Sequence, residues 1–142
     1  MVINAISYSQ IKTVETEKLI EIGKVGALGS KSVWIEKSEN KYLFSYNDIK
    51  FQQITNIKSF AFQNLDNDFE KLYDKIMNGF NEIPSEDIML ELPNDIIWLH
   101  YEKNMGIISF QFRHAVNKNS EVIGFSQFMT KKQIAKLFGK KI

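Results

Sequence analysis

Hydrophobic and polar residues alternate most regularly between residues 96 and 114, which read IIWLHYEKNMGIISFQFRH. Two runs rich in β-branched and aromatic residues flank Lys103-Asn104-Met105-Gly106, and this pattern predicts a hairpin with glycine in its turn. With these four residues as the loop, Glu102 faces Ile107 across the hairpin. One face then carries Ile97, Leu99, Tyr101, Ile108, Phe110 and Phe112, and the other carries Trp98, His100, Glu102, Ser109, Gln111 and Arg113. A slip of one residue mixes the two faces, so the pattern itself restricts the pairing.

A second hairpin is predicted over residues 33–46, with its turn at residues 38–41. Its expected apolar face consists of Val33, Ile35, Phe44 and Tyr46, and its other face of Trp34, Glu36, Leu43 and Ser45. One or two further strands are expected between residues 51 and 62, and single strands over residues 87–92 and 122–128. The middle and end of the chain therefore have a strong β pattern.

In two segments the apolar residues recur at the spacing of a helix instead of alternating with polar residues as in a strand. The first predicted helix covers about residues 67–79, and its apolar stripe consists of Phe69, Leu72, Tyr73, Ile76, Met77 and Phe80. Asn67 with Glu70 resembles a capping box, and Gly79 suits the end of this helix. A second helix is predicted over residues 130–138, with a capping box at Thr130 and Gln133 and a glycine at its end.

The first thirty residues are open to two interpretations. Residues 2–8 and 18–22 fit strands, whereas Ile11, Val14, Lys18 and Ile22 fit a helical stripe. The glycines in GKVGALGSKS lack the spacing of either known phosphate-binding loop, so we expect a flexible connection there.

These elements predict an α+β fold, with an antiparallel sheet system of seven or more strands and two amphipathic helices. Residues 33–80 and 97–139 follow the same plan, because each has an aromatic hairpin with one tryptophan, a further strand and a helix. We therefore expect one domain over residues 1–142. The shared plan has two interpretations, an internal repeat of these two segments or a common amphipathic pattern without duplication. A unit of strands followed by a helix, used twice, resembles in topology only the ββββα repeats of Whirly-type and Pur-type single-stranded nucleic-acid-binding proteins. The chain carries no diagnostic motif of either family, so no family residue is carried over.

Composition narrows the expected function. The chain of 142 residues has 18 basic and 17 acidic side chains, so no strong overall field attracts nucleic acid or anionic membranes. It has no cysteine, which excludes disulfides, thiol catalysis and thiolate metal sites. No signal peptide and no apolar run long enough to span a membrane is recognisable, so a cytoplasmic protein is expected.

The polar face of the hairpin over residues 96–114 holds the main candidate binding residues. They are Trp98, His100, Gln111 and Arg113, and Trp34 occupies a related place in the other hairpin. Arg113 is the only arginine, and tryptophan and arginine dominate the energetics of many binding surfaces. The simpler alternative is a solvated sheet face.

No metal or cofactor site is expected. The two histidines, His100 and His114, belong to opposite faces of the hairpin, and so they do not converge on a metal ion. His100, Ser109 and Glu102 contain the groups of nucleophilic catalysis, but a flat face lacks an oxyanion hole. At the end of the chain, Lys131, Lys132, Lys136, Lys140 and Lys141 form an acid-free segment that suits phosphates or an acidic partner, or simply a solvated helix face.

The function expected from these observations is a non-enzymatic protein-binding module, of the kind that inhibits a toxin or a defence enzyme as immunity proteins do. The alternative is single-stranded nucleic-acid binding, with bases stacked on the sheet aromatics and phosphates on the lysine-rich helix. A second alternative is an enzyme or small-ligand binder without a recognisable motif. A further alternative is a homodimer, since an exposed sheet edge can pair with the same edge of a second copy.

Overall fold

The computed structural model describes residues 18–51 and 53–141. They form an α+β fold with two four-stranded antiparallel sheets, which confirms the fold class expected from the sequence. Sheet A consists of β1 (Ile20–Val25), β2 (Val33–Ser38), β3 (Lys41–Asn47) and β4 (Ile57–Gln63), and α2 (Asp68–Asn81) follows it. Sheet B consists of β5 (Ile88–Glu91), β6 (Ile96–Asn104), β7 (Ile107–Ala115) and β8 (Ile123–Phe125), and α3 (Lys131–Leu137) follows it. Each sheet is a meander in which sequential strands are neighbours.

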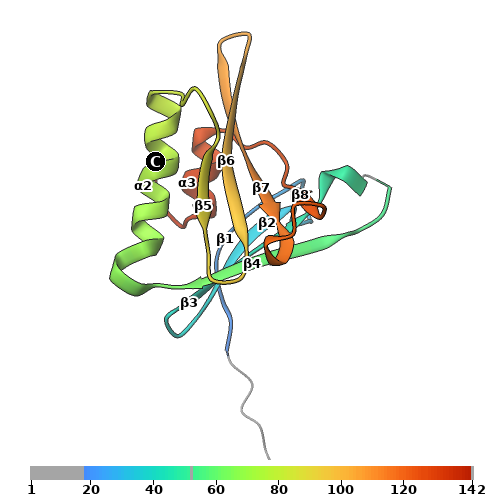
Figure 1. The fold of residues 1–142 in the computed structure, drawn as a ribbon, viewed down its shortest axis with the longest axis vertical. Coiled ribbons are helices and arrows are strands. Elements are labelled where there is room, and N and C mark those ends of the chain that lie inside the picture. The colour runs from blue at the N-terminus through green and yellow to red at the C-terminus, as the bar shows by residue number, and fades with distance from the viewer. Residues whose placement is uncertain (1–17, 52, 142) are drawn as a thin grey trace, which may run out of the picture.

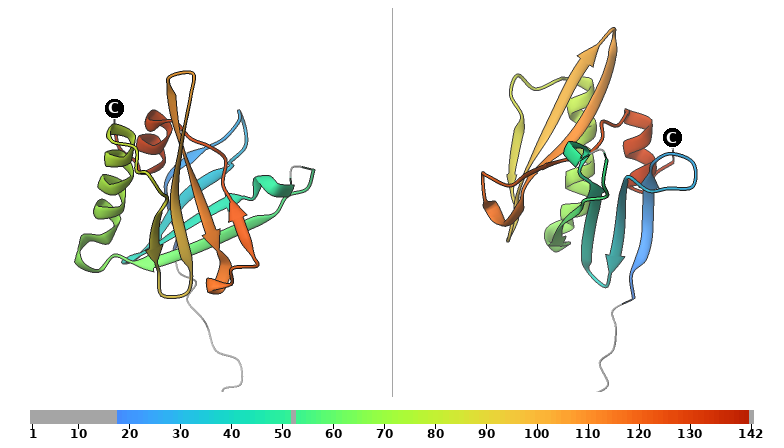
Figure 2. Two further views of the ribbon diagram at one scale, coloured as in Figure 1. Left: turned by 45° about the horizontal axis from the view of Figure 1, so that its top comes forward. Right: turned by 90° about the vertical axis from the view of Figure 1, so that its right-hand side faces the viewer.

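The two sheets cross and pack against each other, with both helices on the same flank of the molecule (Figures 1 and 2). Aromatic rings fill the space between the sheets. The ring of Phe112 in β7 lies 5.9 Å from that of Phe44 in β3 and 5.5 Å from that of Phe60 in β4. Phe44 also contacts Phe138, just after α3, at 5.7 Å. One aromatic core therefore joins both sheets and the second helix.

Each helix contacts strands of the sheet that it does not follow in the chain. Helix α3 follows sheet B but packs mainly against β1, and it also contacts β2 and β7. Helix α2 follows sheet A and contacts β6 and β7, while the ring of Phe69 stacks on Tyr42 of sheet A. At the contact with sheet B, the Tyr101 hydroxyl donates to the carbonyl of Ile76 in α2. The predicted apolar stripe of α2 is confirmed, because Phe69, Leu72, Ile76 and Phe80 are buried.

Two details of α2 differ from the sequence expectation. Gly79 does not end the helix, which continues to Asn81. It lies instead where the Tyr101 ring crosses the helix, and a Cβ at this position would collide with that ring. The Asn67 side chain also forms no capping hydrogen bond; the amide oxygen of Asn64 accepts from the backbone N–H of Phe69 at 2.8 Å. In α3 the predicted capping box of Thr130 and Gln133 is present.

The hairpin of β6 and β7 has the predicted faces but a different register. Its loop is Met105-Gly106 alone, and Glu102 pairs with Ser109 rather than with Ile107. A shift of two residues leaves each side chain on the same face, which is why the face assignment was correct and the pairing was not. In the other hairpin the register is the predicted one, and the pairing continues by one further pair, Ser38 with Lys41, into the expected four-residue loop.

The remaining segments agree only partly with the expectations. The strand expected over residues 18–22 is β1, displaced to Ile20–Val25, and the glycine-rich stretch connects it to β2. One strand, not two, lies between residues 51 and 62, and β8 is shorter than expected. The strand predicted over residues 2–8 lies outside the described residues. In the described part of the chain, no helix is long and apolar enough to cross a membrane.

Candidate functional site

A row of four cross-strand partners crosses the outer face of sheet B. Met89 in β5 pairs with Trp98 in β6, Trp98 pairs with Arg113 in β7, and Arg113 pairs with Phe125 in β8. We call these four residues the Trp98–Arg113 row. Ile97, Leu99 and Tyr101, which alternate with Trp98 and His100 along β6, are buried in the core, so the row faces away from the core. The Met89 side chain is 59% exposed, and Trp98 and Arg113 are partly exposed.

The Arg113 side chain is held in place by three neighbours. Its Nε donates to Oε1 of Gln111 at 2.9 Å, and its guanidinium carbon lies 5.3 Å from the centre of the Phe125 ring. One terminal nitrogen is 4.0 Å from a carboxylate oxygen of Asp87. Gln111 is itself buried and donates from Nε2 to the carbonyl of Ser126 at 2.9 Å. Gln111 therefore positions the arginine and is not an exposed contact residue.

His100 lies on the same face and bridges two carboxylates. Its Nδ1 is 2.8 Å from Asp87 and its Nε2 is 2.9 Å from Glu102. Phe128 contacts the imidazole edge-on at 6.0 Å. Among the residues that the structure describes, no group of three or more histidine and acidic side chains is arranged to hold a metal ion.

The hairpin of β6 and β7 projects beyond its neighbouring strands (Figure 1). Its pairing with β5 ends at Leu99, and its ladder with β8 ends at Arg113. At the tip, Met105 is fully exposed and has a φ of 53°, followed by Gly106 with a φ of 82°. Two consecutive positive φ values are those of a type I′ turn, in which asparagine or glycine suits the first position far better than methionine.

The other predicted binding residues lie elsewhere. Trp34 is partly exposed on the outer face of sheet A, with the Lys31 ammonium 5.1 Å from the centre of its ring. Since the inner faces of the two sheets pack together, Trp34 and Trp98 point away from the core on different sheets. The structure thus brings Trp98, His100, Gln111 and Arg113 together on one face and leaves Trp34 apart.

The five C-terminal lysines do not form a single free patch. Lys140 forms an ion pair with Glu70 of α2 at 2.6 Å, and Lys131 donates to the side chain of Asn81 at 3.2 Å. These two contacts fasten α3 and the residues after it to α2. Lys132, Lys136 and Lys141 are exposed.

A buried hydrogen-bond network inside the molecule was missed by the sequence patterns. Tyr46 of sheet A bonds Nδ1 of His114 at 2.7 Å, and Nε2 of His114 bonds Asp95 at 2.9 Å. Burial lowers the pKa of His114 against the opposing effect of Asp95, so the imidazole is neutral near neutral pH. The Tyr46 hydroxyl then donates to Nδ1, and Nε2–H donates to the carboxylate. The only sequence signal is that His114 shares the core side of β7 and so needs polar partners there.

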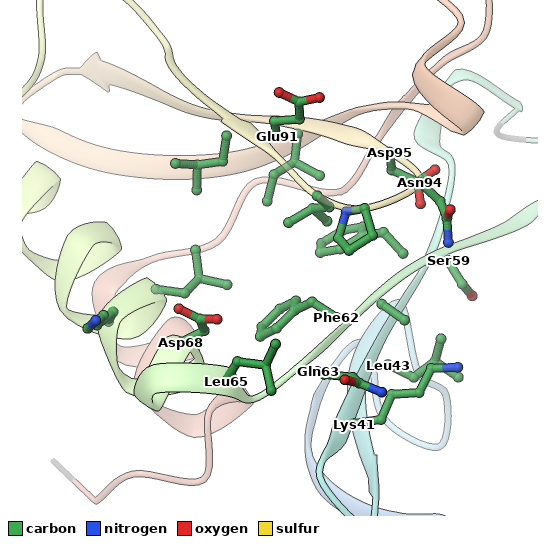
Figure 3. Close-up of a pocket in the computed structure, with 18 of the residues that line it drawn as sticks. Lys41, Leu43, Ser59, Phe62, Gln63, Leu65, Asp68, Glu91, Asn94 and Asp95 are labelled. Atoms are coloured by element: carbon green, nitrogen blue, oxygen red, sulfur yellow. The ribbon is translucent and has the colours of Figure 1, made fainter.

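Asp95 also borders a cleft of about 940 Å³ between β4, α2 and the turn from β5 to β6 (Figure 3). The cleft was not expected from the sequence, because its walls come from segments of both halves of the chain. No protein-family model, curated protein or solved structure matches this chain.

Proposed function

We propose that this protein is a non-enzymatic protein-binding module that inhibits its partner, as immunity-type proteins inhibit a toxin or a defence enzyme. The observation that carries the proposal is the Trp98–Arg113 row, in which the only arginine of the chain is held beside a tryptophan on a partly exposed sheet face. Tryptophan and arginine are the residue types most enriched among binding hot spots.

The geometry around Arg113 favours binding because the side chain is already ordered. The bond to Gln111 and the contact with Phe125 fix the guanidinium before a partner arrives. A partner then loses less free energy to the ordering of this side chain, which costs about 0.5–1.5 kcal/mol at a typical interface. The exposed Met89 and the ring of Trp98 extend the surface with apolar area.

These features define the chemistry of the partner. A carboxylate on the partner can form paired hydrogen bonds with the terminal nitrogens of Arg113, because the guanidinium is planar. Apolar side chains of the partner would cover Met89 and Trp98. The projecting tip of the hairpin, with Met105, supplies a second apolar contact beyond the row.

The experiment compares binding by four versions of the full chain to proteins in an extract of the native host. Arg113→Lys keeps the charge but loses the planar fork, and Trp98→Ala removes the ring; both are expected to lose the captured partner. Trp34→Ala, on the other sheet, is the matched control and is expected to retain it. The captured protein is then assayed with and without the wild-type chain, and its activity is expected to fall on binding. Capture that is equal for wild type, Arg113→Lys and Trp98→Ala would contradict the proposal.

The alternative function, single-stranded nucleic-acid binding, is favoured by one contact, the Lys31 ammonium beside the partly exposed ring of Trp34. A base stacked on Trp34 would place its phosphate near this lysine. This alternative predicts quenching of tryptophan fluorescence by oligonucleotides, weakening steeply with salt and lost in Trp34→Ala. Absence of quenching at low salt would exclude it.

A further inference from the structure

We infer that the free edge of β4 binds an extended peptide segment of a partner protein, which adds to sheet A as a fifth strand. The site is separate from the Trp98–Arg113 row and rests on different residues.

The register of β3 and β4 determines which backbone groups are free. The Asp48 N–H donates to the Asn56 carbonyl at 2.8 Å, and the Asn64 N–H donates to the Asn40 carbonyl at 2.7 Å. Hydrogen-bonded and non-hydrogen-bonded pairs alternate in an antiparallel ladder, so the even-numbered residues of β4 bond to β3. The backbone groups of Ile57, Ser59, Ala61 and Gln63 therefore point away from β3. No other strand in the described part of the chain pairs with this edge.

The cleft of about 940 Å³ runs along this edge, with α2 and the turn from β5 to β6 as its other walls (Figure 3). Its apolar lining includes Phe62, Leu72, Leu90 and Ile97. Ser59 and Ala61, which have short side chains, lie on the β4 wall, so another backbone can approach closely there. Unpaired main-chain groups beside an apolar cleft are the features by which sheet edges bind peptides.

The charged residues that line the cleft are Lys41, Asp68, Lys71, Lys75, Glu91 and Asp95. Along β4 itself the charge changes, because Lys41 is the cross-strand partner of Gln63 at one end and Asp95 lies near Ser59 towards the other (Figure 3). Oδ1 of Asp95 accepts from His114 and from the Asn117 N–H. Its Oδ2 has no donor among the described protein groups. The complementary ligand is an extended segment with an acidic residue beside Lys41 and a basic residue beside Asp95.

The test is selection of short peptides from a displayed random library against the full-length chain, followed by titration of the selected peptides. Ala61→Pro removes one free N–H, and proline is tolerated at an edge position whose N–H does not bond within the sheet. Ala61→Val keeps the N–H and is the matched control. Ala61→Pro is expected to weaken binding about tenfold or more, and Ala61→Val to leave it within a few-fold.

A second variant tests the charge argument independently of the proline. Lys41→Glu is expected to change the preferred residue at that end of the peptide from acidic to basic. The proposal is overturned if the library yields no binder, if Ala61→Pro binds as the wild type does, or if Lys41→Glu keeps the acidic preference. It is also overturned if the wild type is a dimer that Ala61→Pro dissociates, because the edge is then an interface between two copies. Arg113→Lys is expected to retain peptide binding, which separates this site from the one proposed above.

Discussion

The hydroxyl of Tyr46 and Nδ1 of His114 lie 2.7 Å apart, and their hydrogen bond joins the two sheets across the buried core. Both side chains are almost completely buried, Tyr46 at 1% and His114 at 0% exposure. Burial, followed by the nearby charges of Asp48 and Asp95, raises the pKa of Tyr46 far above its ordinary value. The tyrosine is therefore a permanent donor, and the network is satisfied only with a neutral imidazole.

Removal of this donor should destabilise the protein. Tyr46→Phe leaves the ring in place but removes the partner of Nδ1, so a buried acceptor stays unsatisfied. We expect the free energy of unfolding to fall by about 1–3 kcal/mol, measured by urea denaturation. Tyr73→Phe, on the half-buried side of α2, is the control and is expected to change stability by less than about 0.5 kcal/mol.

The low pKa of His114 predicts a loss of stability in mild acid. The folded pKa lies below the unfolded value of about 6.5, so the unfolded chain binds more protons as the pH falls below that value. The free energy of unfolding should therefore decrease below about pH 6.5, with a slope of at most about 1.4 kcal/mol per pH unit. NMR titration of the two histidines provides the check. A His114 imidazole that titrates above 6.5 would reverse the expected slope and contradict the assignment.

Asp48 makes a second connection between the sheets. It is fully buried, accepts from Lys58 at 2.9 Å and from the Phe125 N–H of β8 at 3.1 Å. Burial alone raises the pKa of Asp48, but the hydrogen bonds and the charge of Lys58 outweigh it and hold the pKa below its usual range. This carboxylate thus stabilises the fold above its ordinary pKa of about 3.9, and that stability is lost as the pH falls through the lower folded pKa.

Asp48→Asn should cost about 3 kcal/mol in the free energy of unfolding at neutral pH, because it leaves the Lys58 ammonium without its carboxylate. Asp66→Asn offers a matched comparison, since Asp66 pairs with Lys71 at 2.8 Å on the surface. That exposed pair should contribute well under about 1 kcal/mol. Equal losses in the two variants would show that the buried pair is not the stronger connection.

At the tip of the hairpin of β6 and β7, one substitution is expected to raise stability and to weaken partner binding, so the two effects can be measured separately. Met105→Asn places a residue suited to positive φ before Gly106, so the free energy of unfolding should rise by about 0.5–1 kcal/mol. Partner capture should weaken, because the exposed methionine is lost. Glu39→Gly relieves a φ of 53° at the tip of the other hairpin and should stabilise the fold without weakening capture. Unchanged capture by Met105→Asn would remove the tip from the proposed interface.

Sequence patterns predicted the faces of the strands better than their pairing. The alternation over residues 96–114 correctly placed Trp98 and Arg113 on one face, since this assignment is unchanged by a shift of two residues. The register depends on whether Met105 adopts positive φ, and the methionine gives no sign of this because it is unfavourable there. The helical stripe of α2 was predicted correctly, because the spacing of its apolar residues is a local property.

The connections between sheets were not predictable in the same way. His114 shares the core side of β7 with Phe110 and Phe112, and this pattern shows that it is buried but not what it bonds. Its partners, Tyr46 and Asp95, come from the other sheet and from a turn, and so only the packing of the two halves brings them together. The cleft beside β4 depends on the same packing.

The exchange of helix contacts between the two halves has a consequence for how the chain folds. Helix α3 covers β1 and β2, although more than a hundred residues separate the start of β1 from the start of α3. Each sheet lacks part of its core until the helix of the other half has packed against it. A fragment that contains only sheet A with α2, or only sheet B with α3, should therefore remain largely unstructured. Such long-range closure slows folding and makes it cooperative. We expect the two halves to unfold in a single transition, and to regain structure on mixing only if each can complete the other.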